Sequence, residues 1–145
     1  MMLNLKYPEV VAFQRAAAAH LDAAIGLIEL CSDRSTSTRA HDAVYLVGYV
    51  AECALKALLL SVTPRKRHEQ LMQWFKAEAK HNLDRLKREL SRRKVEIPKR
   101  LALDFSRVRG AWSSEMRYHL RRWKRDDAEL VIDSTERLFE WIQRG

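Results

Sequence analysis

The chain is short of the residues that make turns, which limits the folds open to it. Its 145 residues include only 4 Gly and 3 Pro. An all-β sandwich needs turn residues at about every 8–12 positions, so this class is excluded. Hydrophobic residues make up 47% of the chain, which excludes wholesale disorder and is enough for a core. We therefore expect one helical domain over residues 1–145.

Cysteine is also scarce. The two cysteines, Cys31 and Cys53, lie in apolar runs and have neither a CxxC motif nor metal-ligand spacing. The simplest interpretation is a pair of buried, reduced thiols in a cytoplasmic protein. The first residues, MMLNLKYPEVV, lack the apolar core of a signal peptide, which agrees with a cytoplasmic location.

Acidic residues are under-represented in the third quarter of the chain. Residues 64–125 hold 20 Lys/Arg and 7 Asp/Glu, a net charge of +13, whereas residues 1–63 carry −1 and residues 126–145 carry −4. Such a basic block attracts polyanions, which include RNA, DNA, anionic lipid and acidic proteins. It is also the composition of an ordinary solvated helix, so no single Lys or Arg identifies a partner.

One stretch, residues 43–62, is long and apolar enough for a membrane-spanning helix. Glu52 and Lys56 lie near its middle, and each would cost about 2.5–3.5 kcal/mol at the centre of a bilayer. We therefore expect a buried central helix and no membrane association.

Hydrophobic residues recur at helical spacing through most of the chain. The pattern predicts helices over residues 8–31, 40–62, 67–80, 83–93, 100–109 and 126 to the end, with a turn or short helix over residues 113–119. Pro8 suits a helix start, Pro64 and Pro98 break the chain, and Asn82 can cap the helix after it. The predicted fold class is all-α: an up-and-down bundle of four to five helices with a short extra helix.

Gly26 and Gly48 fall inside the first two predicted helices, where each costs about 1 kcal/mol. A turn in the polar loop over residues 32–39 would place Gly48 opposite Asp22 and Ala23. The pairing of small residues predicts a close approach of the two helix backbones. The alternative is one unoptimised glycine in each helix.

Glu52 is the most informative single residue, because a carboxylate in an apolar helix needs a partner. Lys56 follows four residues later, in the favourable order for an ion pair on one helix face. One interpretation is an internal pair that fixes the helix register. The other is the polar floor of a binding cleft, with Tyr45 and Tyr49 beside it.

The second constellation is AWSSEMRYHLRRWKR, residues 111–125, in which aromatic and basic residues alternate. Aromatic rings stack on unpaired bases while cations neutralise phosphates, so the mixture suits single-stranded nucleic acid. Arg117, Tyr118 and Arg121 are the candidate ligand-binding residues here. The competing interpretation is that the aromatic residues belong to the core and the arginines are solvated.

The five histidines show no HxxxH pair, and no carboxylate completes a metal cluster with them. The chain also has no Gly-rich loop for a nucleotide and no GxSxG elbow. We therefore expect neither a bound metal nor a cofactor.

Three segments together resemble one known family. GYVAECALKALL (residues 48–59), HNLDRL (residues 81–86) and WSSEMRY (residues 112–118) are similar, in this order, to the HEPN superfamily, the "higher eukaryotes and prokaryotes nucleotide-binding" helical domain. The resemblance implies a bundle of four to five helices that is often a dimer. It also implies a role in bacterial toxin–antitoxin or defence systems, frequently with a nucleotidyltransferase-like partner protein.

Many members of that family are metal-independent ribonucleases, and their signature is an Arg followed, after four to six residues, by a His late in the fold. In this chain Arg117 is only two residues before His119, and Arg109 is ten before it. We therefore expect weak or no ribonuclease activity. If the chain does cleave RNA, His119 is the candidate acid–base, with Arg117 or Arg121 stabilising the phosphorane.

The leading hypothesis from the sequence is an RNA- or nucleotide-binding helical domain that forms a homodimer and has a nucleotidyltransferase-type partner. The alternatives are a metal-independent ribonuclease toxin and a structural dimerisation module that binds an acidic partner. The resemblance also places the second helix and the SSEMRY segment around one cleft. From this we expect the Glu52 carboxylate to contact the Arg117 guanidinium, because a guanidinium can bind a carboxylate through two parallel hydrogen bonds.

Overall fold

The second helix, α2 (Thr38–Ser61), is the centre of the molecule in the computed structural model, which describes residues 3–32, 36–112, 116 and 122–144. It contacts α1, α4, α5 and α6, and most of its 24 residues are buried. Its most apolar stretch has the length and composition of a membrane span, but 78% of that stretch is buried inside the molecule. The prediction of a buried central helix is confirmed.

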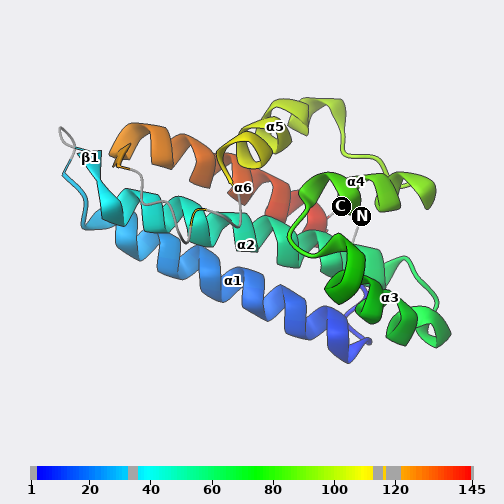
Figure 1. Cartoon of the computed structure of the whole chain (residues 1–145). Coiled ribbons are helices and arrows are strands. Elements are labelled where there is room, and N and C mark those ends of the chain that lie inside the picture. The colour runs from blue at the N-terminus through cyan, green and yellow to red at the C-terminus, as the bar shows by residue number, and fades with distance from the viewer. Residues whose placement is uncertain (1–2, 33–35, 113–115, 117–121, 145) are drawn as a thin grey trace.

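Helix α1 (Pro8–Glu29) lies antiparallel against α2 along most of its length, and α6 (Arg125–Arg144) packs against both (Figure 1). Pro8 stands at the start of α1, where its missing N–H costs nothing. These long helices bury apolar stripes against one another and form the main core. The fold is all-α, as predicted.

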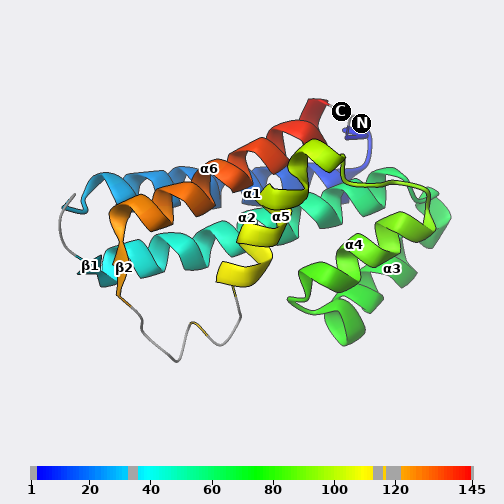
Figure 2. The ribbon, with the colours of Figure 1, turned by 90° about the horizontal axis from the view of Figure 1, so that it is seen from above.

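A short helix pair lies at one end of this bundle (Figure 2). It begins with the 3₁₀ turn η1 (Arg65–Arg67) and α3 (His68–Trp74), continues as the π-helical turn η2 (Phe75–Ala79), and returns as α4 (Leu83–Arg92). Asn82 caps α4, since its side-chain oxygen accepts the Arg85 N–H at 3.1 Å. The sequence predicted one regular helix over residues 67–80, and the structure corrects its last turn to a π-helix.

The 3₁₀ turn η3 (Lys99–Leu101) leads into α5 (Ala102–Ala111), which packs on α6 and α2. The helix predicted over residues 100–109 ends two residues later in the structure, and Gly110 lies inside its last turn. The predicted short helix over residues 113–119 falls almost wholly outside the described residues.

A two-stranded antiparallel ladder joins β1 (Thr36–Ser37) to β2 (Trp123–Lys124), and nothing in the sequence predicted it. Thr36 lies opposite Lys124, and Arg122 donates to the Thr36 carbonyl oxygen at 2.9 Å. The ladder ties the loop between α1 and α2 to the start of α6.

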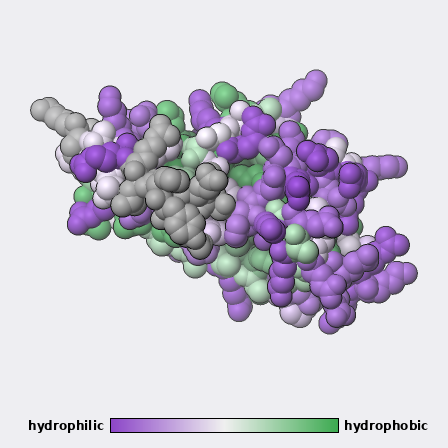
Figure 3. Space-filling model, in the orientation of Figure 1, coloured by the Kyte–Doolittle hydropathy of each residue, from purple (hydrophilic) through white to green (hydrophobic). Residues whose placement is uncertain are grey.

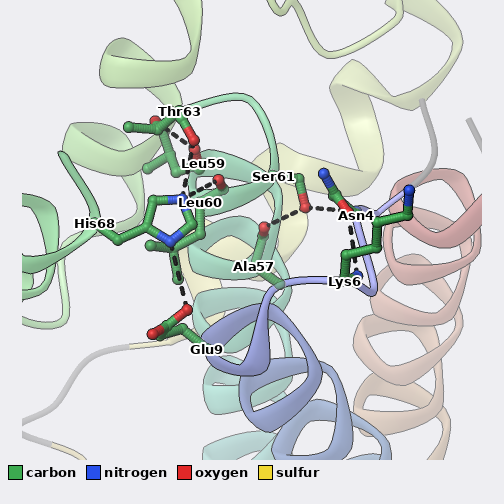
Figure 4. Close-up of polar contacts among 9 residues, drawn as sticks. All are labelled: Asn4, Lys6, Glu9, Ala57, Leu59, Leu60, Ser61, Thr63 and His68. Atoms are coloured by element: carbon green, nitrogen blue, oxygen red, sulfur yellow. Dashed lines mark hydrogen bonds and ion pairs between the residues drawn. The ribbon is translucent and has the colours of Figure 1, made fainter. Parts of the chain in front are cut away.

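His68 fixes the start of α1 against the end of α2 (Figure 4). Its Nε2 lies 2.9 Å from the carbonyl oxygens of both Leu60 and Thr63, so this nitrogen carries the donated proton. Its Nδ1 lies 3.4 Å from Glu9 Oε2. The backbone N–H at the start of α1 and the nearby His68 outweigh partial burial and lower the pKa of Glu9.

Candidate functional site

Glu52 is buried in α2 with 3% of its surface exposed, and two basic groups share one of its oxygens. Lys56 Nζ lies 3.2 Å and His81 Nδ1 lies 2.8 Å from Glu52 Oε1. The predicted pair with Lys56 is present. The expected contact with Arg117 falls on a residue outside the described part of the chain, and so do Tyr118, His119 and Arg121.

His81 is one of the site residues that the sequence did not predict, as are Lys80, Arg85 and Arg109 of the adjoining cleft. Its side chain is 44% exposed, although the carboxylate it binds is almost fully buried. One indication was present in the sequence: HNLDRL, a motif that resembles the family, begins with this histidine. The periodicity of α2 could not reveal it, because His81 and Glu52 are 29 residues apart.

The backbone before His81 is unusual. The Lys80 N–H donates to the Phe75 carbonyl oxygen at 2.8 Å, which closes the π-helical turn. Lys80 itself has φ 46°, in the left-handed region that lysine seldom adopts. Single-turn π-helices and residues of this kind cost energy and gather at functional sites. Here they turn the chain sharply, so that His81 meets Glu52 immediately before α4 begins.

An aromatic cluster borders the pair. Tyr49 packs edge-on against the rings of Tyr45, His81 and Trp112, with centroids 5.2, 5.6 and 5.3 Å away, and His20 lies at 5.8 Å. The two tyrosine hydroxyls are 3.0 Å apart. The face of α2 predicted from the sequence, with Tyr45, Tyr49, Glu52 and Lys56, is therefore present in the structure. His81 and Trp112 pack against this face.

Trp112 explains why position 48 holds a glycine. The indole Nε1–H donates to the Tyr45 carbonyl oxygen at 3.0 Å, which holds the ring against the α2 backbone. A Cβ at Gly48 would lie 1.8 Å from Trp112 Cδ1. Gly26, by contrast, is exposed with open space around it. The predicted small-residue seam between α1 and α2 is therefore wrong for these two glycines.

A cleft of about 530 Å³ opens beside His81, between the start of α4 and the end of α5. Its lining includes three cationic residues, Lys80, Arg85 and Arg109, together with His81 and Trp112. Two carboxylates, Glu78 and Asp84, also line it, and Asp84 Oδ1 lies 3.5 Å from Arg109 Nη1. A half-exposed histidine and three cations at one concave surface suit an anionic ligand.

Lys56 lines a different hollow, of about 450 Å³, which shares Lys80 and His81 with the cleft. Its Nζ lies 5.3 Å from the centroid of the Phe75 ring and 5.8 Å from that of Phe13. The two aromatic rings and the Glu52 carboxylate fix the position of this ammonium next to the site.

Both cysteines are free and buried, as predicted. Burial, together with the neighbouring Glu52 charge, raises the pKa of the Cys53 thiol to about 11. Among residues 3–32, 36–112, 116 and 122–144, no three His, Cys, Asp or Glu side chains lie together as a metal would need.

The comparison with family models decides the family. The model described as HEPN domain matches residues 13–145, which is nearly the whole chain. This chain belongs to the HEPN family. It is therefore a helical domain of the nucleotide-binding and ribonuclease type. Comparisons with curated proteins and with solved structures gave no significant match.

Proposed function

We propose that this HEPN domain binds RNA or a nucleotide at the His81 cleft. The observation that carries the proposal is the convergence of Lys80, Arg85 and Arg109 on the concave surface where His81 is held by a buried carboxylate. Their side chains would neutralise the phosphate of the ligand, and Nε2 of His81 would accept a hydrogen bond from a ribose hydroxyl. The family membership supports the same ligand class.

Binding is tested by fluorescence anisotropy with a labelled mononucleotide and a labelled RNA. We expect Arg109→Ala to weaken the binding of both ligands at least several-fold. Arg144→Ala is the matched control, because Arg144 is an 80% exposed arginine near the far end of α6. Equal binding by wild type and Arg109→Ala would contradict the location, and no binding by wild type at low salt would contradict the function.

A metal-independent ribonuclease is a second candidate, and the Glu52–His81 contact favours it. Because Nδ1–H of His81 donates to Glu52, Nε2 of the neutral ring keeps its lone pair, and no described residue hydrogen-bonds to it. Nε2 could remove the proton from an RNA 2′-hydroxyl. The 2′-oxygen would then bond to phosphorus, the bond to the 5′-oxygen would break, and that oxygen would take up a proton. The products are a 2′,3′-cyclic phosphate and a 5′-hydroxyl.

This candidate predicts cleavage that EDTA does not stop and that His81→Ala abolishes while RNA is still bound. His119→Ala is the informative comparison, because the late position of His119 made it the candidate in the sequence. Loss of cleavage in His119→Ala alone would move the chemistry away from His81. Binding without any cleavage would leave the binding function and remove the nuclease.

We also propose, on family membership alone, that the domain acts as a homodimer in a bacterial toxin–antitoxin or defence system with a nucleotidyltransferase-like partner. Light scattering of the purified protein tests the dimer. Co-purification with the product of an adjacent gene tests the partner.

A further inference from the structure

The net charge of the protein is concentrated in one part of the fold. Residues 64–100 contain 13 Lys/Arg and 5 Asp/Glu, a net charge of +8, whereas the rest of the chain has 14 of each and is neutral. This segment forms η1, α3, η2, α4 and the start of η3. Hydrophilic residues cover this end of the molecule in Figure 3. The structure thus brings all the excess positive charge to one lobe.

Helix α4 has two distinct faces. Leu83, Leu86 and Leu90 are buried, while Arg85, Arg88 and Arg92 are exposed. The three arginines are spaced at i, i+3 and i+7, so they lie along one side of the helix. Seven residues of α-helix rise about 10 Å, which matches about three phosphates at the 3.4 Å axial spacing of a stacked strand.

A third hollow, of about 250 Å³, lies along this side of α4. Its lining includes the same three arginines and Trp74 of α3, which is partly exposed. It shares Arg85 and Glu78 with the His81 cleft, so the two hollows adjoin. A ligand in the cleft can therefore extend along α4.

Two carboxylates, Glu78 and Glu89, line this hollow beside its three arginines and leave it a net charge of +1. Glu89 is bound by Arg92, whose Nη1 lies 3.0 Å from Glu89 Oε2, and by Arg93. Arg92 nevertheless keeps 69% of its side chain exposed. Arg88 has no ion pair within the described part of the chain. An aromatic ring beside exposed arginines is the combination that binds single strands, by stacking bases and neutralising phosphates.

We propose that Arg85, Arg88, Arg92 and Trp74 form a track for the backbone of a single RNA strand, one nucleotide of which occupies the His81 cleft. We refer to these four residues as the α4 track. The proposal rests on the proposed function and narrows it, because it makes the ligand an oligonucleotide rather than a free nucleotide. The partly exposed indole favours RNA over an acidic protein, which would need the cations alone.

The test compares a mononucleotide with a ten-nucleotide RNA by fluorescence anisotropy over a series of salt concentrations. The variant is Arg88→Ala with Arg92→Ala, and the charge-matched control is Arg15→Ala with Arg144→Ala on α1 and α6. The logarithm of the binding constant falls linearly with the logarithm of the salt concentration, and the steepness of this line is the salt slope. Removing one cation that binds a phosphate of a single strand lowers the salt slope by about 0.7. Removing two such cations should therefore weaken the binding of the ten-nucleotide RNA about 25-fold at 0.1 M salt. The affinity for the mononucleotide should change by no more than about twofold.

Trp74→Ala supplies an independent signature. Stacking involves no counterion release, so this variant should weaken the ten-nucleotide RNA without changing its salt slope. Circular dichroism of each variant checks that the helices remain.

The outcomes separate the two proposals. If wild type binds the mononucleotide and the longer RNA equally well, the α4 track is refuted and the cleft function stands. Equal weakening in the track variant and its control would also refute the track, as charge alone would explain it. If poly-glutamate displaces the RNA with equal affinity, the surface is one for acidic proteins. If wild type binds neither RNA nor mononucleotide, both proposals fail.

Discussion

The buried Glu52 gives the sharpest test of the structure. Replacing Glu52 with Gln keeps the shape of the side chain but removes the charge that faces Lys56 and His81. The Lys56 side chain is only 12% exposed, so its ammonium would lose its counter-ion where little water can solvate it instead. Breaking a buried pair from one side costs about 3–5 kcal/mol. Since Lys56 keeps slight access to water, we expect about 3 kcal/mol for Glu52→Gln.

The partner variant completes a double-mutant cycle. Lys56→Met removes the ammonium and keeps most of the apolar stem that packs near Phe13 and Phe75. The double variant contains no unpaired buried charge from this pair, so its cost should fall below the sum of the single costs by more than about 1.5 kcal/mol. His81 moderates the effect of Lys56→Met, because it still donates to the carboxylate at 2.8 Å.

Urea denaturation followed by far-ultraviolet circular dichroism measures these differences, provided that the slope against urea is unchanged. Glu140→Gln is the control, because its partner Arg144 is 80% exposed and Glu140 itself is 61% exposed. Such surface pairs contribute about 0–1 kcal/mol. A cost of Glu52→Gln no greater than that of Glu140→Gln, or single costs that add within about 0.5 kcal/mol, would show that Glu52 and Lys56 are not a coupled buried pair.

Three further predictions concern other parts of the fold. Gly48→Ala should destabilise the fold by about 1–3 kcal/mol, because its methyl group would overlap the indole ring of Trp112. Gly26→Ala should stabilise the fold by up to about 1 kcal/mol, because its methyl group would enter open space and alanine favours the helix. Urea denaturation measures both changes. Burial acts to raise the pKa of Asp104, but hydrogen bonds from Arg137 and a buried serine outweigh it and lower that pKa. The carboxylate therefore stabilises the fold above its unfolded pKa, and the advantage of wild type over Asp104→Asn should disappear as the pH falls below about 4 in pH-dependent unfolding. Cys53, with a pKa of about 11, should react with a thiol reagent at pH 8 only after urea is added, since about one thiol in a thousand is ionised there; prompt labelling of the folded protein would contradict its burial.

The sequence predicted those features that depend on neighbouring residues. The spacing of apolar residues predicted α1, α2 and α4 closely, and Asn82 was identified as the cap of α4. The pairing of Glu52 with Lys56 was also predicted, since four residues are about one turn of a helix.

What the sequence could not predict depends on segments that are far apart in the chain. Two-residue strands carry no periodic pattern, so the β1–β2 ladder could not be read from them. The π-helical turn and the left-handed Lys80 place His81 on Glu52, and neither has a pattern that sequence periodicity detects.

Gly48 illustrates the same division. That this glycine needs close packing followed from its cost inside a helix. The group that packs on Gly48 is Trp112, which lies 64 positions later in the chain. Only the packing of α5 on α2 decided this contact. The local chain determined which helices form and which faces they bury, because hydrogen bonds and side-chain spacing along a helix involve near neighbours. The tertiary structure decided which groups meet in the site, because burying those faces allows only one arrangement of the helices and their connecting turns.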